Sequence, residues 1–158
     1  SLEARVPGRF NANNVDLNRN FDCDWRAQGT WQSRTVSGGS EAFSEPEARA
    51  VRDYVETNDI AGAVVYYSAA GGVYSSSCGG AVSEETKTMT TLYANAAGYD
   101  SYEEFDSYEI NGDMVNWMAK SGIPAISVLL TDHRNAEWAK NQRGIESLLS
   151  YFAEQERT

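Results

Sequence analysis

The sequence predicts an α/β fold, a mixed and largely parallel sheet flanked by helices on both faces. Two apolar runs of strand length, AGAVVYYS at residues 61–68 and AISVLL at residues 125–130, have the continuous hydrophobicity of buried strands. Segments with helical periodicity lie between and after them, and such alternation is typical of a sheet covered on both sides. The chain has 158 residues, 41% of them hydrophobic, which predicts one domain over residues 1–158.

The first element expected is a short strand over residues 12–18, in which Val15 and Leu17 face the same side. This strand ends at the adjacent pair Asn18 and Arg19. Residues 22–43 contain Gly, Ser and Trp without any period, so a long loop is expected there.

The first helix is expected to begin in the stretch SEPE, residues 44–47, and to run to about residue 57. Ser44 is the expected N-cap, and Glu47, three residues later, is its expected partner in a capping box. Pro46 is compatible with this start because proline is tolerated in the first turn of a helix.

The remaining elements complete the alternating pattern. A turn, AAGG, follows the first buried strand, and helices are expected over residues 83–97, 114–120 and 136–154. In a sheet of this class, ligands bind beyond the carboxyl ends of the strands. Three places qualify for a ligand site: the pair Asn18-Arg19, the pair Tyr67-Ser68, and the end of the strand at residues 125–130.

Charge and hydropathy limit the possible partners. The formal net charge is -10, from 23 acidic and 13 basic residues, which argues against nucleic acid or an anionic membrane surface. No apolar run approaches the roughly 18 residues of a membrane span. A ligand with its own negative charge would need a local group of basic residues.

The two cysteines, Cys23 and Cys78, both lie in loop-like stretches rich in Gly, Asp and Ser. Two loop cysteines without a CxxC motif favour one structural disulfide, formed in an oxidising compartment. The alternative is two unrelated thiols.

A series of short motifs covers almost the whole chain. They are GR at residues 8–9, NANNVDLNRNF at 11–21, FSEPE at 43–47, YS at 67–68, Tyr108 followed by Gly112 and Trp117, and GIPA at 122–125. In this order they resemble the later part of the catalytic domain of the zinc metallocarboxypeptidases, the carboxypeptidase A/B-like or funnelin family. The resemblance implies a carboxypeptidase-like fold truncated on its N-terminal side. The activity that it implies is hydrolysis of the C-terminal peptide bond with zinc.

The resemblance also implies roles for individual residues. Asn18 and Arg19 match the pair that binds the free C-terminal carboxylate of a peptide, a task suited to the planar donor fork of arginine. Arg9 matches the arginine that polarises the scissile carbonyl and stabilises the developing oxyanion. Tyr108 matches the mobile tyrosine that closes over the substrate, and Ser68 belongs to the substrate-binding strand end.

The expected side-chain preference is open. Val115 falls near the family's position at the base of the side-chain pocket, where an apolar residue favours apolar C-terminal side chains. Asp113, nearby, would instead favour a basic side chain.

The family's metal site is not reproduced in this sequence. Zinc is held in the family by a His-x-x-Glu pair and a later histidine, with a water in the open position. His133 is the only histidine, so no His-x-x-Glu occurs, and one histidine beside Asp132 would make at best a weak site. The later ligand position aligns with Tyr67, whose neutral phenol is a poor zinc ligand at neutral pH.

The general base of the family is a glutamate near the end of the last strand. Counting from Tyr108 and Trp117 places this position at Leu130, whereas counting from the Gly-Ile-Pro segment places it at Leu129. Adjacent strand residues face opposite sides, so only one of the two leucines looks into the site. In both cases the base is replaced by an apolar side chain.

Three hypotheses follow. The first is a metallocarboxypeptidase-like domain that binds a peptide or peptide-like ligand by its free C-terminal carboxylate but is catalytically inactive, with no cofactor expected in this chain. The second is a portion of an active zinc carboxypeptidase completed by a missing segment. The third is a structural or engineered scaffold derived from the family. The disulfide and the resemblance together predict an extracellular or secreted location.

Overall fold

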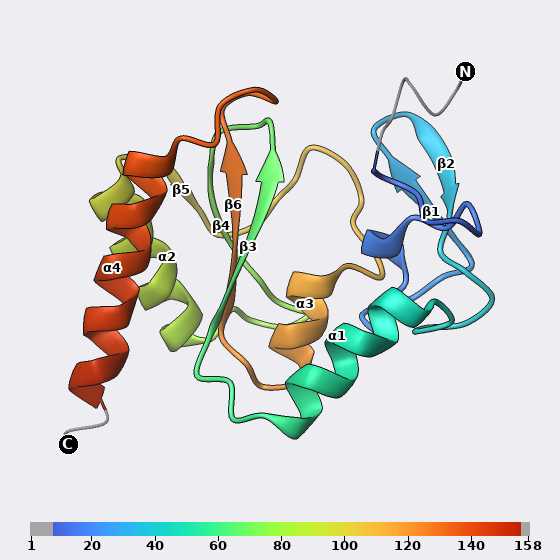
Figure 1. Ribbon diagram of the computed structural model, residues 1–158, viewed down its shortest axis with the longest axis horizontal. Coiled ribbons are helices and arrows are strands. Elements are labelled where there is room, and N and C mark those ends of the chain that lie inside the picture. The colour runs from blue at the N-terminus through green and yellow to red at the C-terminus, as the bar shows by residue number, and fades with distance from the viewer. Residues whose placement is uncertain (1–7, 156–158) are drawn as a thin grey trace.

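The computed structural model describes residues 8–155, and a four-stranded sheet lies at its centre (Figure 1). The strand order is β3-β6-β4-β5, where β3 is Ala63–Ser68, β6 is Ala125–Leu130, β4 is Gly72–Ser75 and β5 is Ser101–Tyr102. The β3–β6 and β4–β5 pairs are parallel and the β4–β6 pair is antiparallel. The predicted mixed, largely parallel sheet is therefore confirmed.

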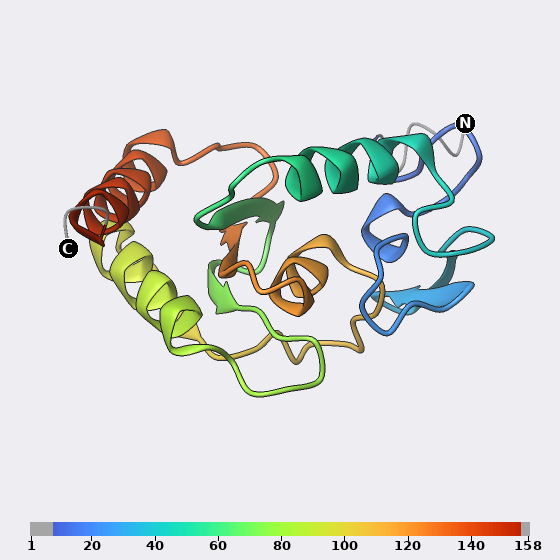
Figure 2. The same cartoon turned by 90° about the horizontal axis from the view of Figure 1, so that it is seen from below.

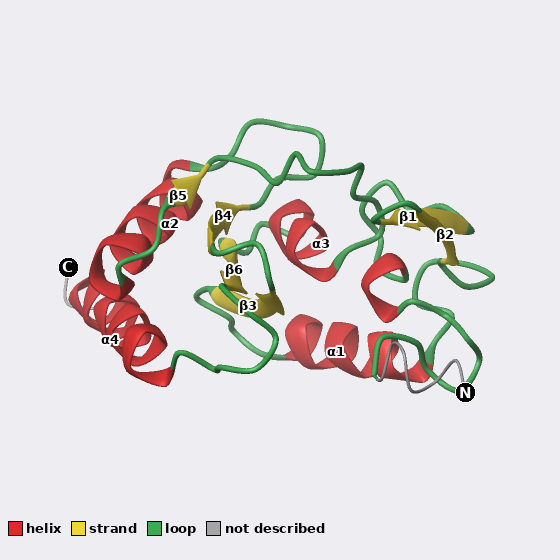
Figure 3. Ribbon diagram, turned by 90° about the horizontal axis from the view of Figure 1, so that it is seen from above, coloured by secondary structure: helices red, strands yellow, loops and turns green. Residues whose placement is uncertain are grey.

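Helices cover both faces of this sheet (Figures 2 and 3). Helices α2 (Glu84–Ala97) and α4 (Trp138–Gln155) pack together on one face, and α1 (Pro46–Thr57) and α3 (Met114–Lys120) lie on the other. Alternate residues of β6 serve the two layers, because Ile126 and Val128 join the core under α2 and α4 while Ala125 joins the core under α3. Leu129 then faces the same side as Ala125.

The layer on the α1 and α3 side is held by three aromatic rings in mutual contact. The ring centroids of Phe21, Phe43 and Trp117 lie 5.3–5.6 Å apart. Two of these rings belong to the segments 11–21 and 43–47, and the third belongs to α3. Aromatic packing therefore joins the N-terminal segments to the sheet, since such rings supply large buried areas.

The N-terminal part of the chain differs from the prediction. The strand expected over residues 12–18 is wrong: residues 15 and 16 form only isolated bridges, and Leu17–Arg19 is a turn of 3-10 helix, η2. The loop expected over residues 22–43 contains a β-hairpin, β1 (Gln28–Trp31) paired antiparallel with β2 (Arg34–Ser37). Asp16 explains the local turn, because its side chain accepts a hydrogen bond from the Asn18 backbone N–H in place of a strand neighbour.

The capping box predicted for the first helix is also wrong. Helix α1 begins at Pro46 with Glu45 in the N-cap position and no side-chain capping hydrogen bond. The Ser44 hydroxyl is used elsewhere, since it accepts from Asn20 Nδ2 at 3.0 Å and donates to Glu45 Oε1 at 2.8 Å. The Glu45 carboxylate also accepts from Asn11 and Asn13 Nδ2, at 2.6 and 2.7 Å. The start of α1 thus anchors the N-terminal segment.

One disulfide joins Cys23 to Cys78, as predicted, with 5.8 Å between the Cα atoms. It connects the loop after η2 to the loop after β4. None of the helices within residues 8–155 combines the length and hydropathy that a bilayer crossing would require.

Candidate functional site

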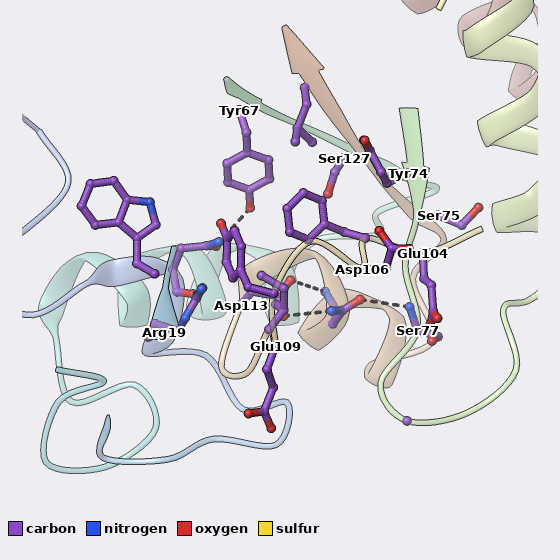
Figure 4. Close-up of a pocket in the computed structure, with 18 of the residues that line it drawn as sticks. Arg19, Tyr67, Tyr74, Ser75, Ser77, Glu104, Asp106, Glu109, Asp113 and Ser127 are labelled. Carbon is purple, nitrogen blue, oxygen red and sulfur yellow. Dashed lines mark hydrogen bonds between the residues drawn. The ribbon is translucent and has the colours of Figure 1, made fainter. Parts of the chain in front are cut away.

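A cavity of about 660 Å³ lies between the sheet and the N-terminal segments (Figure 4). Its walls come from η2 and the β1–β2 hairpin, from the strands β3, β4 and β6, from residues 104–110 and from the start of α3. All three places predicted from the sequence contribute to this one cavity. Its volume falls in the range of small-molecule and peptide sites.

Arg19 forms the positive end of the cavity. Its side chain is 1% exposed, yet it lines the cavity. The Nε and NH2 groups donate to the Thr30 carbonyl at 3.1 and 2.5 Å, and NH1 donates to the Asn18 carbonyl at 2.6 Å. A guanidinium has five N–H donors, so two of them remain without an acceptor among the described residues. Arg19 therefore has more donors than the described residues use.

Two glycines make room for Arg19. Gly112 has a φ of +62°, in the left-handed region that favours glycine, and a Cβ there would lie 2.4 Å from the Arg19 carbonyl oxygen. A Cβ on Gly29 would lie 2.8 Å from Arg19 Cδ. The arginine is therefore enclosed by a glycine from the hairpin and a glycine from the segment before α3.

Asn18 presents its amide with a defined orientation. Its Oδ1 accepts hydrogen bonds from the Tyr67 hydroxyl at 3.0 Å and from the Met114 backbone N–H at 3.3 Å. With the oxygen engaged in this way, the Nδ2 donors remain for a ligand in the cavity that Asn18 lines. Asn18 and Arg19, which the sequence predicted to act as a pair, both line the cavity.

Arg9 also lines the cavity but is held by other contacts. Its NH2 forms a 2.5 Å ion pair with Oδ2 of Asp16, which is 1% exposed, and its guanidinium lies 4.3 Å from the ring centroid of Trp31. Its Nε is buried without a partner among the described residues. Trp31 belongs to the hairpin, so β1–β2 positions both arginines.

Tyr67 and Leu129 lie side by side on the floor of the cavity. They are paired residues of β3 and β6, and both line the cavity, whereas Leu130 does not. Burial raises the pKa of Tyr67 well above its ordinary value, and the negative charge of Asp113 adds to this shift. The phenol therefore stays neutral and donates to Asn18.

The other predicted residues divide between the cavity and the core. Ser68, Tyr108 and Asp113 line the cavity, and Asp113 is buried at the start of α3, where it accepts from Asn116. Burial raises the pKa of Asp113, although the hydrogen bonds from Asn116 oppose the shift. Val115 is 2% exposed, packs in the core around α3, and is not among the residues that line the cavity.

Three acidic residues of the cavity were missed by the sequence reasoning. Glu104, Asp106 and Glu109 also line the cavity, and Figure 4 shows Glu104 and Asp106 on the side opposite Arg19. The signal was present in the run EEFDSYE at residues 103–109, which follows β5. It was overlooked because only Tyr108 in this run belongs to a motif.

The described residues do not fit a zinc ion. Among them, no group of three His, Cys, Asp or Glu side chains is arranged to hold a metal. His133 instead places Nδ1 2.8 Å from Oγ of Ser68, at the exposed ends of β6 and β3. The neutral phenol of Tyr67 and the apolar side chain of Leu129 supply neither an anionic ligand nor a base.

Comparison with known proteins relates this arrangement to peptidases. A sequence profile described as zinc carboxypeptidase matches residues 3–151. The structure of murein-tripeptide amidase MpaA from Escherichia coli O157 is 19% identical, with a TM-score of 0.67, over 87% of this chain and 58% of that one. Carboxypeptidase A from Helicoverpa armigera is 21% identical, with a TM-score of 0.67, over 84% of this chain and 40% of that one.

A third similar structure is bovine thrombin-activatable fibrinolysis inhibitor in complex with a tick carboxypeptidase inhibitor. It is 21% identical, with a TM-score of 0.66, over 87% of this chain and 54% of that one. At these identities the likeness concerns the fold, and the chain spans about half the length of the structures that it matches.

Proposed function

The chain belongs to the zinc carboxypeptidase family, and on this premise we propose that it binds peptides by their free C-terminal carboxylate without hydrolysing them. The main support for this proposal is that Arg19 is buried and has donors that the described residues do not use. A buried guanidinium with two free donors, at the end of a cavity of about 660 Å³, is suited to a carboxylate.

Asn18 supports the same role. Because its Oδ1 is held by Tyr67 and Met114, its amide offers donors rather than an acceptor to the cavity. A carboxylate has only acceptor atoms, so it matches a site made of guanidinium and amide donors. One carboxylate oxygen of the ligand would bind Arg19 and the other Asn18.

The absence of hydrolysis is proposed from the floor of the cavity. Tyr67 and Leu129 stand where the family resemblance places a zinc ligand and the general base. A neutral phenol and an aliphatic side chain can neither hold the metal nor remove a proton from water. They fill the floor without leaving a buried charge unpaired, which would be costly.

We also propose that the protein acts outside the cytosol. The disulfide between Cys23 and Cys78 supports this location, because structural disulfides persist in oxidising compartments.

Calorimetric titration with N-acetyl-Ala-Lys, as the free acid and as the C-terminal amide, tests the carboxylate site. The free acid is expected to bind with a Kd in the millimolar range or below. Amidation should weaken it at least about tenfold, since a charge-assisted hydrogen bond contributes about 1.5–3 kcal/mol. Equal affinities for acid and amide would overturn the proposal, whatever the behaviour of any variant.

A matched variant, Arg19→Lys, keeps the charge but loses the planar donor fork and should bind the free acid more weakly. Circular dichroism of this variant shows whether the fold survives the change at a buried position. The same peptide, incubated with the protein in a buffer containing zinc, is expected to remain intact by mass spectrometry. Release of lysine would show that the chain is catalytically competent, contrary to the proposal.

A further inference from the structure

We infer that Ser68 and His133 form a second reactive site, in which the serine hydroxyl attacks carboxylic esters. Strand β3 ends at Ser68, and His133 is the third residue after β6. Because β3 and β6 are parallel neighbours, both residues lie at the same edge of the sheet (Figure 1). The activity is separate from peptide binding, since neither Arg19 nor Asn18 takes part in it.

A hydrogen bond joins the hydroxyl to the imidazole. Ser68 Oγ lies 2.8 Å from His133 Nδ1, which is within the range for a serine nucleophile and its histidine base. In the neutral tautomer that carries its proton on Nε2, Nδ1 accepts from the Ser68 hydroxyl. His133 is the only histidine in the sequence, so it is the only imidazole base that the chain can supply.

The loop after β6 holds His133 in a tight turn. Asp132 Oδ1 accepts hydrogen bonds from the backbone N–H groups of Arg134 and Asn135, at 2.6 and 2.7 Å. The backbone of His133 lies between this acceptor and its two donors. A base held in such a turn needs little rearrangement before it can accept a proton, which is a requirement of an organised site.

Asp132 also supplies a negative charge close to the imidazole. The N–H groups of Arg134 and Asn135 lower the pKa of the Asp132 carboxyl, and the charge of His133 adds to this shift. The carboxylate therefore stays ionised and favours the imidazolium that forms when His133 takes up a proton. Its hydrogen bonds are to the backbone, so its effect on His133 is electrostatic.

A substrate can reach this pair from the cavity. Ser68 lines the cavity of about 660 Å³, and both Ser68 and His133 are exposed. Leu129 and Trp31 give the same cavity apolar surface that an acyl group can contact. A small neutral ester suits this position, because it brings no charge into a cavity lined by both acids and arginines.

The reaction has two stages. The Ser68 hydroxyl passes its proton to His133 Nδ1 while its oxygen bonds to the ester carbonyl carbon. The bond from this carbon to the alcohol oxygen then breaks, the alcohol takes the proton from Nδ1, and the acyl group stays on Ser68. Water next attacks the acyl carbon and gives a proton to His133, which returns it to Ser68 as the acid leaves.

Esters are expected to react and peptides are not. An alkoxide or phenolate leaves far more readily than an amine, so an ester needs less help from the site. The intact peptide expected in the proposed function is therefore compatible with a reactive Ser68.

Incubation of the full chain with 4-nitrophenyl acetate, followed by peptide mapping in a mass spectrometer, tests the nucleophile. Ser68 is expected to carry an acetyl group. Ser75, Ser77 and Ser127 line the same cavity without a histidine partner among the described residues, and they should stay unmodified. An unmodified Ser68, or equal acetylation of all four serines, would overturn the inference.

The variant His133→Gln separates a base from a hydrogen-bond partner. Its amide can accept from the Ser68 hydroxyl but cannot take up a proton, so acetylation of Ser68 should slow about 100-fold or more, the usual contribution of a general base. Circular dichroism checks that the fold survives this exposed change. An unchanged rate in the folded variant would refute the role of His133.

The ester reaction and the peptide binding fail in distinguishable ways. The acetate ester carries no carboxylate, so its reaction with Ser68 does not report on the carboxylate site. Lack of acetylation would leave peptide binding untouched, and equal binding of the acid and amide peptides would leave the serine reaction untouched.

Discussion

Tyr67 links the floor of the cavity to Asn18, whose amide we propose as a donor to the ligand. Its hydroxyl donates to Asn18 Oδ1 at 3.0 Å, and this bond fixes which end of the amide faces the cavity. Asn18 and Tyr67 are therefore coupled, and a substitution of Tyr67 should alter the orientation of the Asn18 amide.

Tyr67→Phe tests this coupling. Loss of the hydroxyl should lower the free energy of unfolding by about 0.5–1.5 kcal/mol, the net value of a typical hydrogen bond. It should also weaken binding of the carboxylate peptide, because Asn18 loses one of the two contacts that orient it. Urea denaturation and calorimetry measure the two effects.

Tyr54→Phe is the control, since Tyr54 is 63% exposed and its hydroxyl has no hydrogen-bond partner among the described residues. It should change neither quantity. Equal effects of the two substitutions would contradict the coupling.

At the scale of single residues, the sequence predicted the positive end of the cavity better than the negative end. Asn18 and Arg19 are adjacent in the chain and belong to a motif, so their shared place at the cavity was predictable without a structure. Glu104 and Asp106 become part of the same site only because β5 and the rings of Tyr102 and Phe105 bring their segment against β4. This contact is tertiary and has no local signature.

At the scale of elements, the start of α1 depends on a buried carboxylate. Hydrogen bonds from Asn11, Asn13 and Ser44 lower the pKa of Glu45 below its ordinary value of 4.5. Because the pKa is lower in the folded protein, the stabilisation by Glu45 is complete above the ordinary value. It disappears as the pH falls through the lower folded-state value.

Glu45→Gln should therefore flatten the dependence of unfolding free energy on pH at and below about pH 4.5. At neutral pH it should cost about 1–3 kcal/mol, because the part-buried hydrogen bonds from Asn11 and Asn13 lose a charged acceptor. Glu56→Gln, at the exposed end of the same helix, serves as the control. Parallel pH profiles for wild type and Glu45→Gln would show that the carboxylate is not responsible.

A second prediction concerns the packing of α4 against α2, where Gly144 of α4 meets Tyr93 of α2. A Cβ on Gly144 would lie 2.5 Å from the ring of Tyr93, which is fully buried. Gly144→Ala should therefore destabilise the protein by about 1–3 kcal/mol, the usual cost of overpacking, despite the better helix propensity of alanine.

Gly80→Ala is the matched control, because a Cβ at Gly80 meets nothing within 4 Å. Thermal denaturation compares the two variants. A gain in stability for Gly144→Ala would mean that Tyr93 can move away at little cost.

The elements that sequence patterns missed are short and have unusual turns. The hairpin β1–β2 turns through Gln32, whose φ of +54° is typical of Gly or Asn rather than Gln. The sequence therefore lacks the Asn-Gly or Asp-Gly dipeptide by which such a turn is usually predicted. Strand β4 has only four residues. Its first residue, Gly72, was predicted as the last residue of the turn AAGG at residues 69–72. Strand β6 and the helices were predictable because burial imposes a pattern over many residues. Strand β3 was predicted correctly as a strand but wrongly as a buried one, because it lies at the edge of the sheet and its residues are half-buried or exposed.

At the scale of the whole molecule, one disulfide joins two distant parts of the chain. Cys23 and Cys78 are separated by 55 residues, and the Cys23 carbonyl accepts from Gly112 N–H beside Arg19. Reduction, or the double variant Cys23→Ser/Cys78→Ser, should lower the free energy of unfolding by roughly 2–4 kcal/mol, mainly through the unfolded state.

Denaturation with and without a reducing agent measures this cost. In the doubly substituted chain the reducing agent should have no further effect, which provides the control. Unchanged stability of the wild type on reduction would contradict a structural role for the bond.

The walls of the cavity come from residues as far apart in the chain as Arg9 and Leu129. No single stretch contains the site, so the site has no local precursor during folding and exists only after the distant segments have met. A peptide that binds there recognises the native state and not the unfolded chain, and it shifts the folding equilibrium by mass action. Occupancy of the cavity is therefore a measure of how much of the protein is folded.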